Sequence, residues 1–208
     1  TTRLVGSEMC IRDRFDTFCA YLYKMIHLID KYLYQKTIRR ECTSFPSDLL
    51  FGKELFVIGG AKINIGKGCK LGDYCILTAW ESFVSDTFSP NISIGNNANI
   101  GCYNNITSIT SISIGDNFLS GRWVTITDHA HGNGSKAELN IAPFEKRLYS
   151  KGEISIGNNV WIGDKVTILG NVRIGDNVVI GANSVVTKSI PCNTIAAGNP
   201  CKVIKEIK

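Results

Sequence analysis

A repeat of six residues runs through the C-terminal part of this 208-residue chain. Six aliphatic residues open the successive repeats: Ile156, Ile162, Ile168, Ile174, Ile180 and Val186. A period of six fits neither the 3.6-residue turn of an α-helix nor the two-residue alternation of a strand. It is typical of a solenoid in which each repeat forms a short strand and a corner, and three repeats close a triangular coil. The pattern predicts a left-handed parallel β-helix, whose first and fifth repeat positions face inward and stack eighteen residues apart.

The repeat extends toward the N-terminus with interruptions. It can be followed through Ile65, Leu71, Ile94, Ile100 and, after a shift of two residues, Ile114. Polar and aromatic residues break its phase at 78–92, and residues 128–153 form a longer interruption that contains two histidines. A long loop on a rigid scaffold usually carries function. We therefore predict a β-helix domain over residues 51–208, with excursions at 78–92 and 128–153.

Residues 1–50 form a separate N-terminal extension. Apolar residues recur there at helical spacing and predict an amphipathic helix from about residue 15 to residue 40. These residues are Phe15, Phe18, Cys19, Leu22, Ile26, Ile29 and Leu33. A cap over the open end of the solenoid is the favoured interpretation of this helix. Contact with a membrane surface or a polyprenyl-linked substrate is the alternative. Residues 1–14 fit neither role, and both disorder and a non-native origin stay open for them.

The composition of the chain indicates which classes of partner it can bind and which cell compartment it belongs to. The net charge of +5 is small and dispersed, which argues against nucleic acid. Of the eight cysteines, Cys69 and Cys75 occupy fifth repeat positions, where a free thiol suits a small inward side chain. No C-x-x-C pair and no cleavable signal sequence is present. These features predict a reduced, cytoplasmic protein. No apolar run is long enough to span a bilayer, so membrane association would be peripheral, through the N-terminal helix.

Three motifs add a family resemblance to the repeat. They are DHAHG at residues 128–132, NNVWIG at 158–163, and an SVVTK…AAGNP ending at 184–200. With these motifs, residues 58–208 resemble the hexapeptide-repeat acyltransferases, and most of all the galactoside, maltose and polysaccharide O-acetyltransferases. The resemblance implies acetyl-coenzyme A as the donor and a sugar or polysaccharide precursor as the acceptor. It also implies a homotrimer, with the donor groove between neighbouring solenoids.

Acetyl transfer to a sugar hydroxyl needs a base, because an alcohol is a poor nucleophile at neutral pH. A neutral imidazole suits this task. Of the three histidines, His27 lies on the N-terminal helix, where a structural role is expected. His129 matches the catalytic histidine of the family, and the resemblance implies that it is the general base. We expect Asp128 to orient its imidazole, with capping of the loop as the alternative. His131 is expected to project differently after a turn and to contact the acceptor.

The donor site can be carried over from the family residue by residue. The resemblance places the pantetheine arm of coenzyme A against Trp161, Gly163, Asp164 and Ala182, and its phosphates near Thr187, Lys188 and Lys202. The galactoside enzyme has a serine where this chain has Asp164. Because a carboxylate cannot donate a hydrogen bond to an oxyanion, a backbone N–H near Gly163 and Asp164 would have to do so.

The acceptor side is less clear in the sequence. Asn104 and Asn105 lie near the place where relatives hold the acceptor or the histidine, and a stack of internal asparagines is the alternative. Trp80, Tyr103 and Trp123 offer either a stacking face for a sugar or filling for coil ends. No metal is expected, because the repeat domain contributes only an H-x-H pair of histidines.

The sequence as a whole predicts an acetyl-coenzyme A-dependent O-acetyltransferase. Its acceptor would be a hydroxyl of an envelope or capsular polysaccharide or of a precursor. Two alternatives stay open. One is an antibiotic or amino-sugar acetyltransferase on the same scaffold, and the other is a non-catalytic β-helix scaffold protein.

Overall fold

The computed structural model describes residues 2–42 and 44–208, without the side chains of residues 2–15, 27 and 31. The chain divides into two compact units, residues 1–41 and 42–208. The first contains one helix, α1 (Thr2–Glu41), which begins well before the start predicted near residue 15. No proline interrupts residues 2–14, so the helix can continue through them. Capping by α1 stays a prediction, and the side chain of His27 lies outside the described residues.

The described part of α1 exposes many large apolar side chains. They include Phe18, Leu22, Ile26, Ile29 and Leu33. Among the described residues, no helix is both long and apolar enough to cross a membrane.

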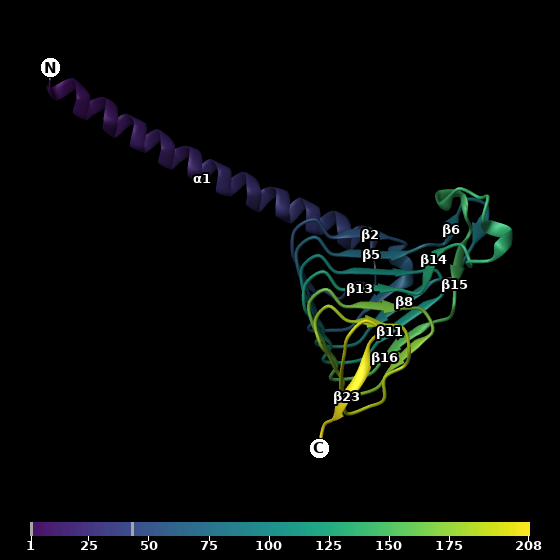
Figure 1. The fold of residues 1–208 in the computed structure, drawn as a ribbon. Coiled ribbons are helices and arrows are strands. Elements are labelled where there is room, and N and C mark those ends of the chain that lie inside the picture. The colour runs from purple at the N-terminus through teal and green to yellow at the C-terminus, as the bar shows by residue number, and fades with distance from the viewer. Residues whose placement is uncertain (1, 43) are drawn as a thin grey trace. The chain divides into compact units, whose positions relative to one another are not determined.

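The second unit is a stack of coils built from three sheets, which we name A, B and C (Figure 1). Sheet A contains β1 (Leu50–Phe51), β4 (Lys70–Leu71), β9 (Asn99–Ile100), β12 (Leu119–Ser120), β17 (Trp161–Ile162), β20 (Val179–Ile180), β22 (Thr194–Ala197) and β23 (Lys202–Glu206). Sheet B contains β2 (Phe56–Ile58), β5 (Ile76–Ala79), β10 (Asn105–Ser108), β13 (Thr125–Thr127), β18 (Thr167–Leu169) and β21 (Val185–Val186). Sheet C contains β3 (Ile63–Ile65), β8 (Asn91–Ile94), β11 (Ser111–Ile114), β16 (Ile154–Ile156) and β19 (Val172–Ile174). A 3₁₀ turn, η1 (Gly60–Lys62), joins β2 to β3.

Among the described strands of sheets A, B and C, successive coils pair in parallel, and the exception is β23, which runs antiparallel to its neighbour β22. The predicted inward positions are confirmed, because all six aliphatic residues that open the C-terminal repeats are buried. The interval of eighteen residues holds in the C-terminal coils, where Ile162 pairs with Ile180. An earlier pair, Ile106 and Ile126, is twenty residues apart. The difference arises because four residues, 108–111, separate the paired positions of sheets B and C in the earlier coil, where the later coil has only two, 170 and 171.

The corners explain why the repeat favours Gly, Asp and Asn. At the corner of Gly121, the carboxylate of Asp164 in the next coil accepts the backbone N–H of Arg122 at 2.8 Å. A Cβ atom on Gly121 would lie 2.0 Å from that carboxylate oxygen, so only glycine fits. The fourth repeat position has positive φ, which asparagine tolerates better than most residues. Each coil therefore turns through the same backbone geometry.

We predict that the interior thiols resist labelling in the folded protein. Cys75 is fully buried, and burial raises the pKa of its thiol to about 11. At about pH 8, such a thiol is only about one thousandth thiolate, the reactive form. Ellman's reagent should therefore modify the exposed Cys19 and Cys192 first and reach Cys69 and Cys75 only after unfolding. The control is the unfolded protein, in which all eight thiols should react. Rapid labelling of Cys75 in the folded protein would contradict this prediction.

Candidate active site

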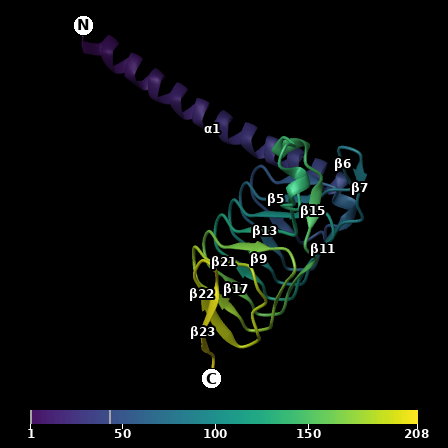
Figure 2. The ribbon, with the colours of Figure 1, turned by 45° about the vertical axis from the view of Figure 1, so that its right-hand side comes forward.

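Both predicted excursions leave the stack at the corner between sheets B and C, and each contains a hairpin (Figure 2). In the first, β6 (Ser82–Phe83) pairs with β7 (Asp86–Thr87). In the second, β14 (His129–His131) pairs with β15 (Leu148–Ser150), and two 3₁₀ turns, η2 (Lys136–Glu138) and η3 (Pro143–Glu145), lie between them. The segment 128–153 is therefore an ordered antiparallel ladder with a folded tip.

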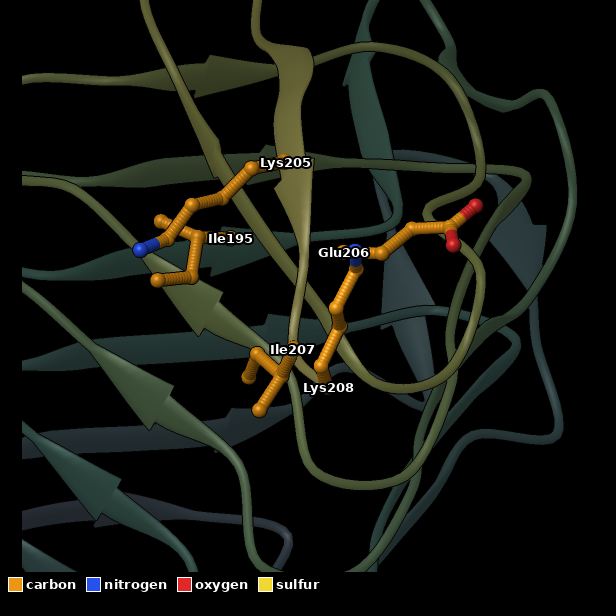
Figure 3. Close-up of a pocket in the computed structure, with 5 residues that line it drawn as sticks. All are labelled: Ile195, Lys205, Glu206, Ile207 and Lys208. Carbon is orange, nitrogen blue, oxygen red and sulfur yellow. The ribbon is translucent and has the colours of Figure 1, made fainter.

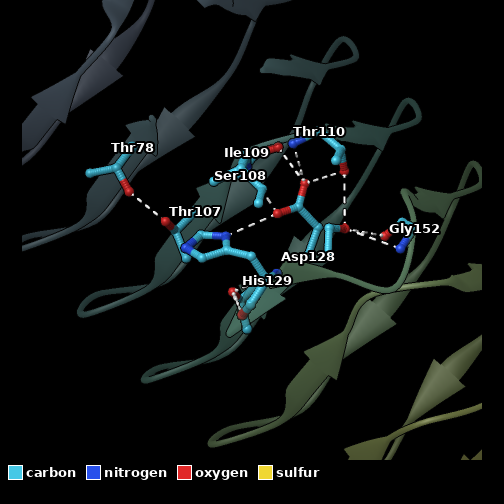
Figure 4. A network of polar contacts seen from close by, with 10 residues as sticks. Thr78, Thr107, Ser108, Ile109, Thr110, Asp128, His129 and Gly152 are labelled. Atoms are coloured by element: carbon cyan, nitrogen blue, oxygen red, sulfur yellow. Dashed lines mark hydrogen bonds and ion pairs between the residues drawn. The ribbon is translucent and has the colours of Figure 1, made fainter. Parts of the chain in front are cut away.

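The carboxylate of Asp128 lies buried at the base of the second excursion, where it accepts five hydrogen bonds (Figure 4). The donors are the Ser108 hydroxyl at 2.6 Å, the Thr110 hydroxyl at 2.7 Å and backbone N–H at 2.9 Å, and the Ile109 N–H and His129 Nδ1 at 3.0 Å. Like the other corner carboxylates, Asp128 bonds backbone N–H groups of the preceding coil. It differs from them in also contacting a histidine.

The hydrogen bonds to Asp128 determine the ionisation state of its carboxyl group. Burial on its own would raise the pKa of this carboxyl, but the bonds from His129, Ser108, Ile109 and Thr110 together lower it below its usual value. Asp128 is therefore ionised at neutral pH. An ionised carboxylate only accepts hydrogen bonds, so His129 Nδ1 must donate. In the neutral imidazole, the lone pair then lies on Nε2.

His129 is held in place by one hydrogen bond to its backbone and one to its ring. Its backbone carbonyl accepts a hydrogen bond from the Thr127 hydroxyl at 3.0 Å, and its Nδ1 is fixed by Asp128. The side chain is 10% exposed, and no group among the described residues hydrogen-bonds to Nε2. His129 also lines a pocket of about 350 Å³, together with His131, Tyr149 and Lys151. This arrangement suits a base that accepts a proton from a bound molecule.

His131 lies on the same short strand as His129, so no turn separates them. The expectation that it projects differently after a turn is wrong, because residues two apart on a strand share a face. Its ring meets Phe83 of the first excursion edge to face, with centroids 5.2 Å apart. This contact could not be predicted from the sequence, because residues 78–92 show only a loss of the phase of the repeat.

The predicted donor residues gather around the corner between sheets A and B. Trp161 lies on sheet A with half of its surface exposed, and Gly163 and Asp164 form the corner beside it. The Asn183 N–H bonds to the Asp164 carbonyl at 2.9 Å, which places Ala182 next to Asp164 in the following coil. The predicted stacking of these two residues is confirmed.

Ala182 offers no side-chain acceptor to the corner residue of the preceding coil. In two earlier coils an Asp side chain at this corner accepts the N–H of the equivalent residue in the preceding coil, as Asp73 does for Lys53 and Asp164 does for Arg122. Asp176 does the same for Asn158 at the next corner. The methyl group of Ala182 cannot accept, and no group among the described residues bonds to the Asp164 N–H. That N–H is available to a ligand.

The three remaining donor residues, Thr187, Lys188 and Lys202, are all exposed near the C-terminal end of the stack. A groove of about 720 Å³ that the sequence did not reveal lies nearby, lined by Ile195, Lys205, Glu206, Ile207 and Lys208 (Figure 3). None of the three predicted residues lines this groove. The groove was difficult to predict from the sequence, because a charged C-terminal strand is usually only a solvated surface.

Within one chain, His129 and the donor corner lie at opposite edges of sheet B. Arg122, which Asp164 contacts, precedes His129 by seven residues, which turn at Trp123 and then follow β13. At no more than about 3.3 Å per residue, the separation reaches roughly 20 Å. A single copy therefore does not bring the base to the donor residues.

On the acceptor side, the structure separates the two asparagines. Asn104 is buried and donates to the carbonyls of Gly101 and Gly121 at 2.6 and 2.8 Å, which favours the internal alternative. Asn105 lies on the outer side of sheet B, and its buried Oδ1 has no hydrogen-bond partner among the described residues. Asn105 is thus the better candidate for a ligand contact.

The exposed aromatic rings form a stack of their own. The Tyr103 ring lies parallel to Tyr74 on one side and Trp123 on the other, with centroids 5.1 and 5.3 Å apart. The Lys165 ammonium lies 5.7 Å from the centre of the Trp123 ring. Because neighbours cover both faces of Tyr103, its ring does not offer a stacking face for a sugar.

Known proteins share this repeat and fold. Residues 153–188 match the family described as bacterial transferase hexapeptide (six repeats). The chain is 43% identical to the galactoside O-acetyltransferase of Escherichia coli K12, over 62% of this chain and 61% of that protein. It is 42% identical to the "Putative lipopolysaccharide biosynthesis O-acetyl transferase WbbJ" of the same organism, over 55% of this chain and 60% of that protein. The chain thus spans about 60% of the length of these curated relatives.

A solved structure matches over a larger part of the chain. The maltose O-acetyltransferase of Clostridium difficile 630 is 31% identical, with a TM-score of 0.56. The match covers 86% of this chain and 78% of that one.

Proposed function

Since the chain belongs to the hexapeptide-repeat transferases, we propose that it is an acetyl-coenzyme A-dependent O-acetyltransferase that acts on a sugar hydroxyl. The observation that carries this proposal is the Asp128–His129 pair, in which an ionised carboxylate holds Nδ1 and leaves Nε2 open. Relatives named for galactoside and lipopolysaccharide O-acetylation support a sugar acceptor from an envelope or capsular polysaccharide or its precursor. The relatives also support the left-handed form of the β-helix.

In the proposed reaction, His129 Nε2 removes the proton of the acceptor hydroxyl as its oxygen attacks the thioester carbonyl carbon. The tetrahedral intermediate collapses with cleavage of the carbon–sulfur bond. The departing thiolate of coenzyme A takes the proton from Nε2, which regenerates the neutral imidazole. Asp128 stabilises the imidazolium between these two steps and holds its orientation.

We propose that the thioester binds at the corner of Gly163, Asp164 and Ala182. The free N–H of Asp164 is a donor for the thioester or for the oxyanion that develops from it. Trp161 would wall the pantetheine channel, and Thr187, Lys188 and Lys202 would approach the phosphates. The side chain of Asp164 is already engaged with the Arg122 N–H, so it serves the corner rather than the reaction.

A neighbouring copy must complete the site, because His129 and the donor corner of one chain are roughly 20 Å apart. We propose a homotrimer in which His129 of one copy faces the donor corner of the next. The outer face of sheet B supports this assembly, because none of its outward residues is charged. They are Phe56, Ile58, Ile76, Thr78, Asn105, Thr107, Thr125, Thr127, Thr167, Leu169 and Val185. Closed rotational symmetry is the usual arrangement of such copies.

The test is release of free thiol from acetyl-coenzyme A in the presence of a panel of mono- and oligosaccharides. Turnover that depends on a sugar, with an ester-linked acetyl group in the product, would support the proposal. Acetylation of amino groups alone would replace it with an N-acetyltransferase. If no acceptor is used and calorimetry detects no binding of coenzyme A, the scaffold alternative replaces it.

We predict that Ala182→Asp weakens the use of acetyl-coenzyme A without unfolding the coil. The new carboxylate would accept the Asp164 N–H, as Asp164 accepts that of Arg122, and would block the donor that we propose for the thioester. The KM for acetyl-coenzyme A should rise about tenfold, the loss expected for one good hydrogen bond. The control is Ala182→Val, which adds side-chain volume at the corner but no hydrogen-bond acceptor. An unchanged KM in Ala182→Asp would remove the Asp164 N–H from the donor site.

A further inference from the structure

The two excursions are joined by contacts that the proposed reaction does not use. Arg147 directly precedes β15, and its guanidinium bonds both carboxylate oxygens of Asp86 on β7. The Nε–Oδ2 distance is 2.6 Å and the Nη2–Oδ1 distance is 2.5 Å. A bidentate pair of this kind fixes direction as well as distance. It ties the hairpin of the first excursion to the ladder that carries His129.

The Asp86–Arg147 ion pair is connected to the strand that carries both histidines. The carbonyl of Arg147 accepts the N–H of Gly132, the residue directly after β14, at 2.8 Å. On the same strand, His131 lies against Phe83 of the first hairpin. Residues 82–87 thus support the β14–β15 ladder at two places. Phe83 contacts one face of the ladder, and Asp86 holds the end that lies away from the stack.

The remainder of the ladder is held at its other end. Asp128 anchors the start of β14 in the corner, and Ser150 at the end of β15 bonds to Gly152. Between these anchors and the tip, the strands are only three residues long. Such a short two-stranded ladder is marginal in isolation, so its outer end needs external support.

We propose that Asp86 and Arg147 are positioning residues, which hold the β14–β15 ladder so that His129 and His131 face the acceptor. This inference rests on the proposed function for the identity of the reaction but not for the contact itself. The Arg147 side chain is 80% exposed, whereas the Asp86 side chain is 12% exposed. Because the guanidinium stays in water, the pair adds little to global stability, so its main effect is on the geometry of the ladder. A shift of about 1 Å at a reacting group can reduce the rate up to a hundredfold.

The test compares Asp86→Asn, Arg147→Gln and the exchanged double variant D86R/R147D with the wild type. Each single variant should lower kcat about tenfold, with the KM for acetyl-coenzyme A and the Tm unchanged. The exchanged pair should recover most of the loss. The matched control is Glu81→Gln, which removes the Lys62–Glu81 ion pair at the base of the same hairpin and leaves the ladder untouched.

Hydrogen exchange supplies a readout that does not require turnover. The amides of residues 129–132 should exchange about tenfold faster in Asp86→Asn than in the wild type or Glu81→Gln. Faster exchange without any acetylation by the wild type would support the brace and count against the proposed function. Unchanged exchange and kcat in both single variants would overturn the brace, as would an exchanged pair no better than either single variant.

Discussion

Replacing His129 with alanine should lower sugar-dependent thiol release about a thousandfold, the middle of the range for general base catalysis. The loss should appear in kcat, while the dissociation constant of coenzyme A stays unchanged, because the proposed contacts with coenzyme A do not include the His129 side chain. The measurement is steady-state turnover at saturating acetyl-coenzyme A, combined with calorimetry of coenzyme A binding.

The control for this variant is His131→Ala, on the same strand. It removes the contact with Phe83 but leaves the Asp128–His129 pair, so its loss of kcat should be much smaller. Equal turnover of His129→Ala and the wild type, in proteins of the same oligomeric state, would mean that another group removes the proton.

Replacing Asp128 with alanine should reduce both stability and turnover. The variant leaves the buried N–H groups of Ile109 and Thr110 without an acceptor, each at a penalty of about 1–3 kcal/mol. We expect the free energy of unfolding to fall by about 3 kcal/mol. Turnover should fall at least about a hundredfold, because His129 loses the partner that fixes its tautomer.

Asp128→Asn separates the two effects. Its amide oxygen can still accept from a backbone N–H, so much of the stability should remain. Its uncharged side chain cannot stabilise an imidazolium, so turnover should stay low. Urea unfolding at matched protein concentration and kcat on the same preparations make the comparison. If Asp128→Asn kept wild-type turnover, the charge of Asp128 would have no part in catalysis.

The pH dependence follows from the lowered pKa of Asp128 in the folded protein. A carboxyl with a lowered folded pKa stabilises the protein above its unfolded pKa, which is about 3.9. That contribution disappears as the pH falls through the folded pKa. The stability difference between the wild type and Asp128→Ala should therefore be constant near neutrality and shrink below about pH 4.

Most of the fold could be predicted from the six-residue repeat, because each position of the repeat meets one physical requirement. Ile162 and Ile180 fill the interior, and the glycine before each corner residue leaves room for the next coil. The base of the site was also predictable, since His129 and Asp128 are neighbours in a motif. The bonds to Ser108 and Thr110 were not, because they depend on two residues added to an earlier coil.

The contacts of the first excursion could not be predicted from the sequence. Asp86 and Arg147 are 61 residues apart, and neither belongs to the repeat. Only the folded corner brings both hairpins to the same side of the stack. Similarly, Asn104 and Asn105 look equivalent in the sequence, yet strand alternation turns one into the core and the other outward.

The reversed direction of β23 has a consequence for the protein in the cell. A parallel stack ends in a row of open N–H and C=O groups, which can template the addition of another chain. β23 covers that row on β22, and three of its five residues, Lys202, Lys205 and Glu206, are charged. The last strand thus covers the C-terminal edge of sheet A, where another chain could otherwise add a strand.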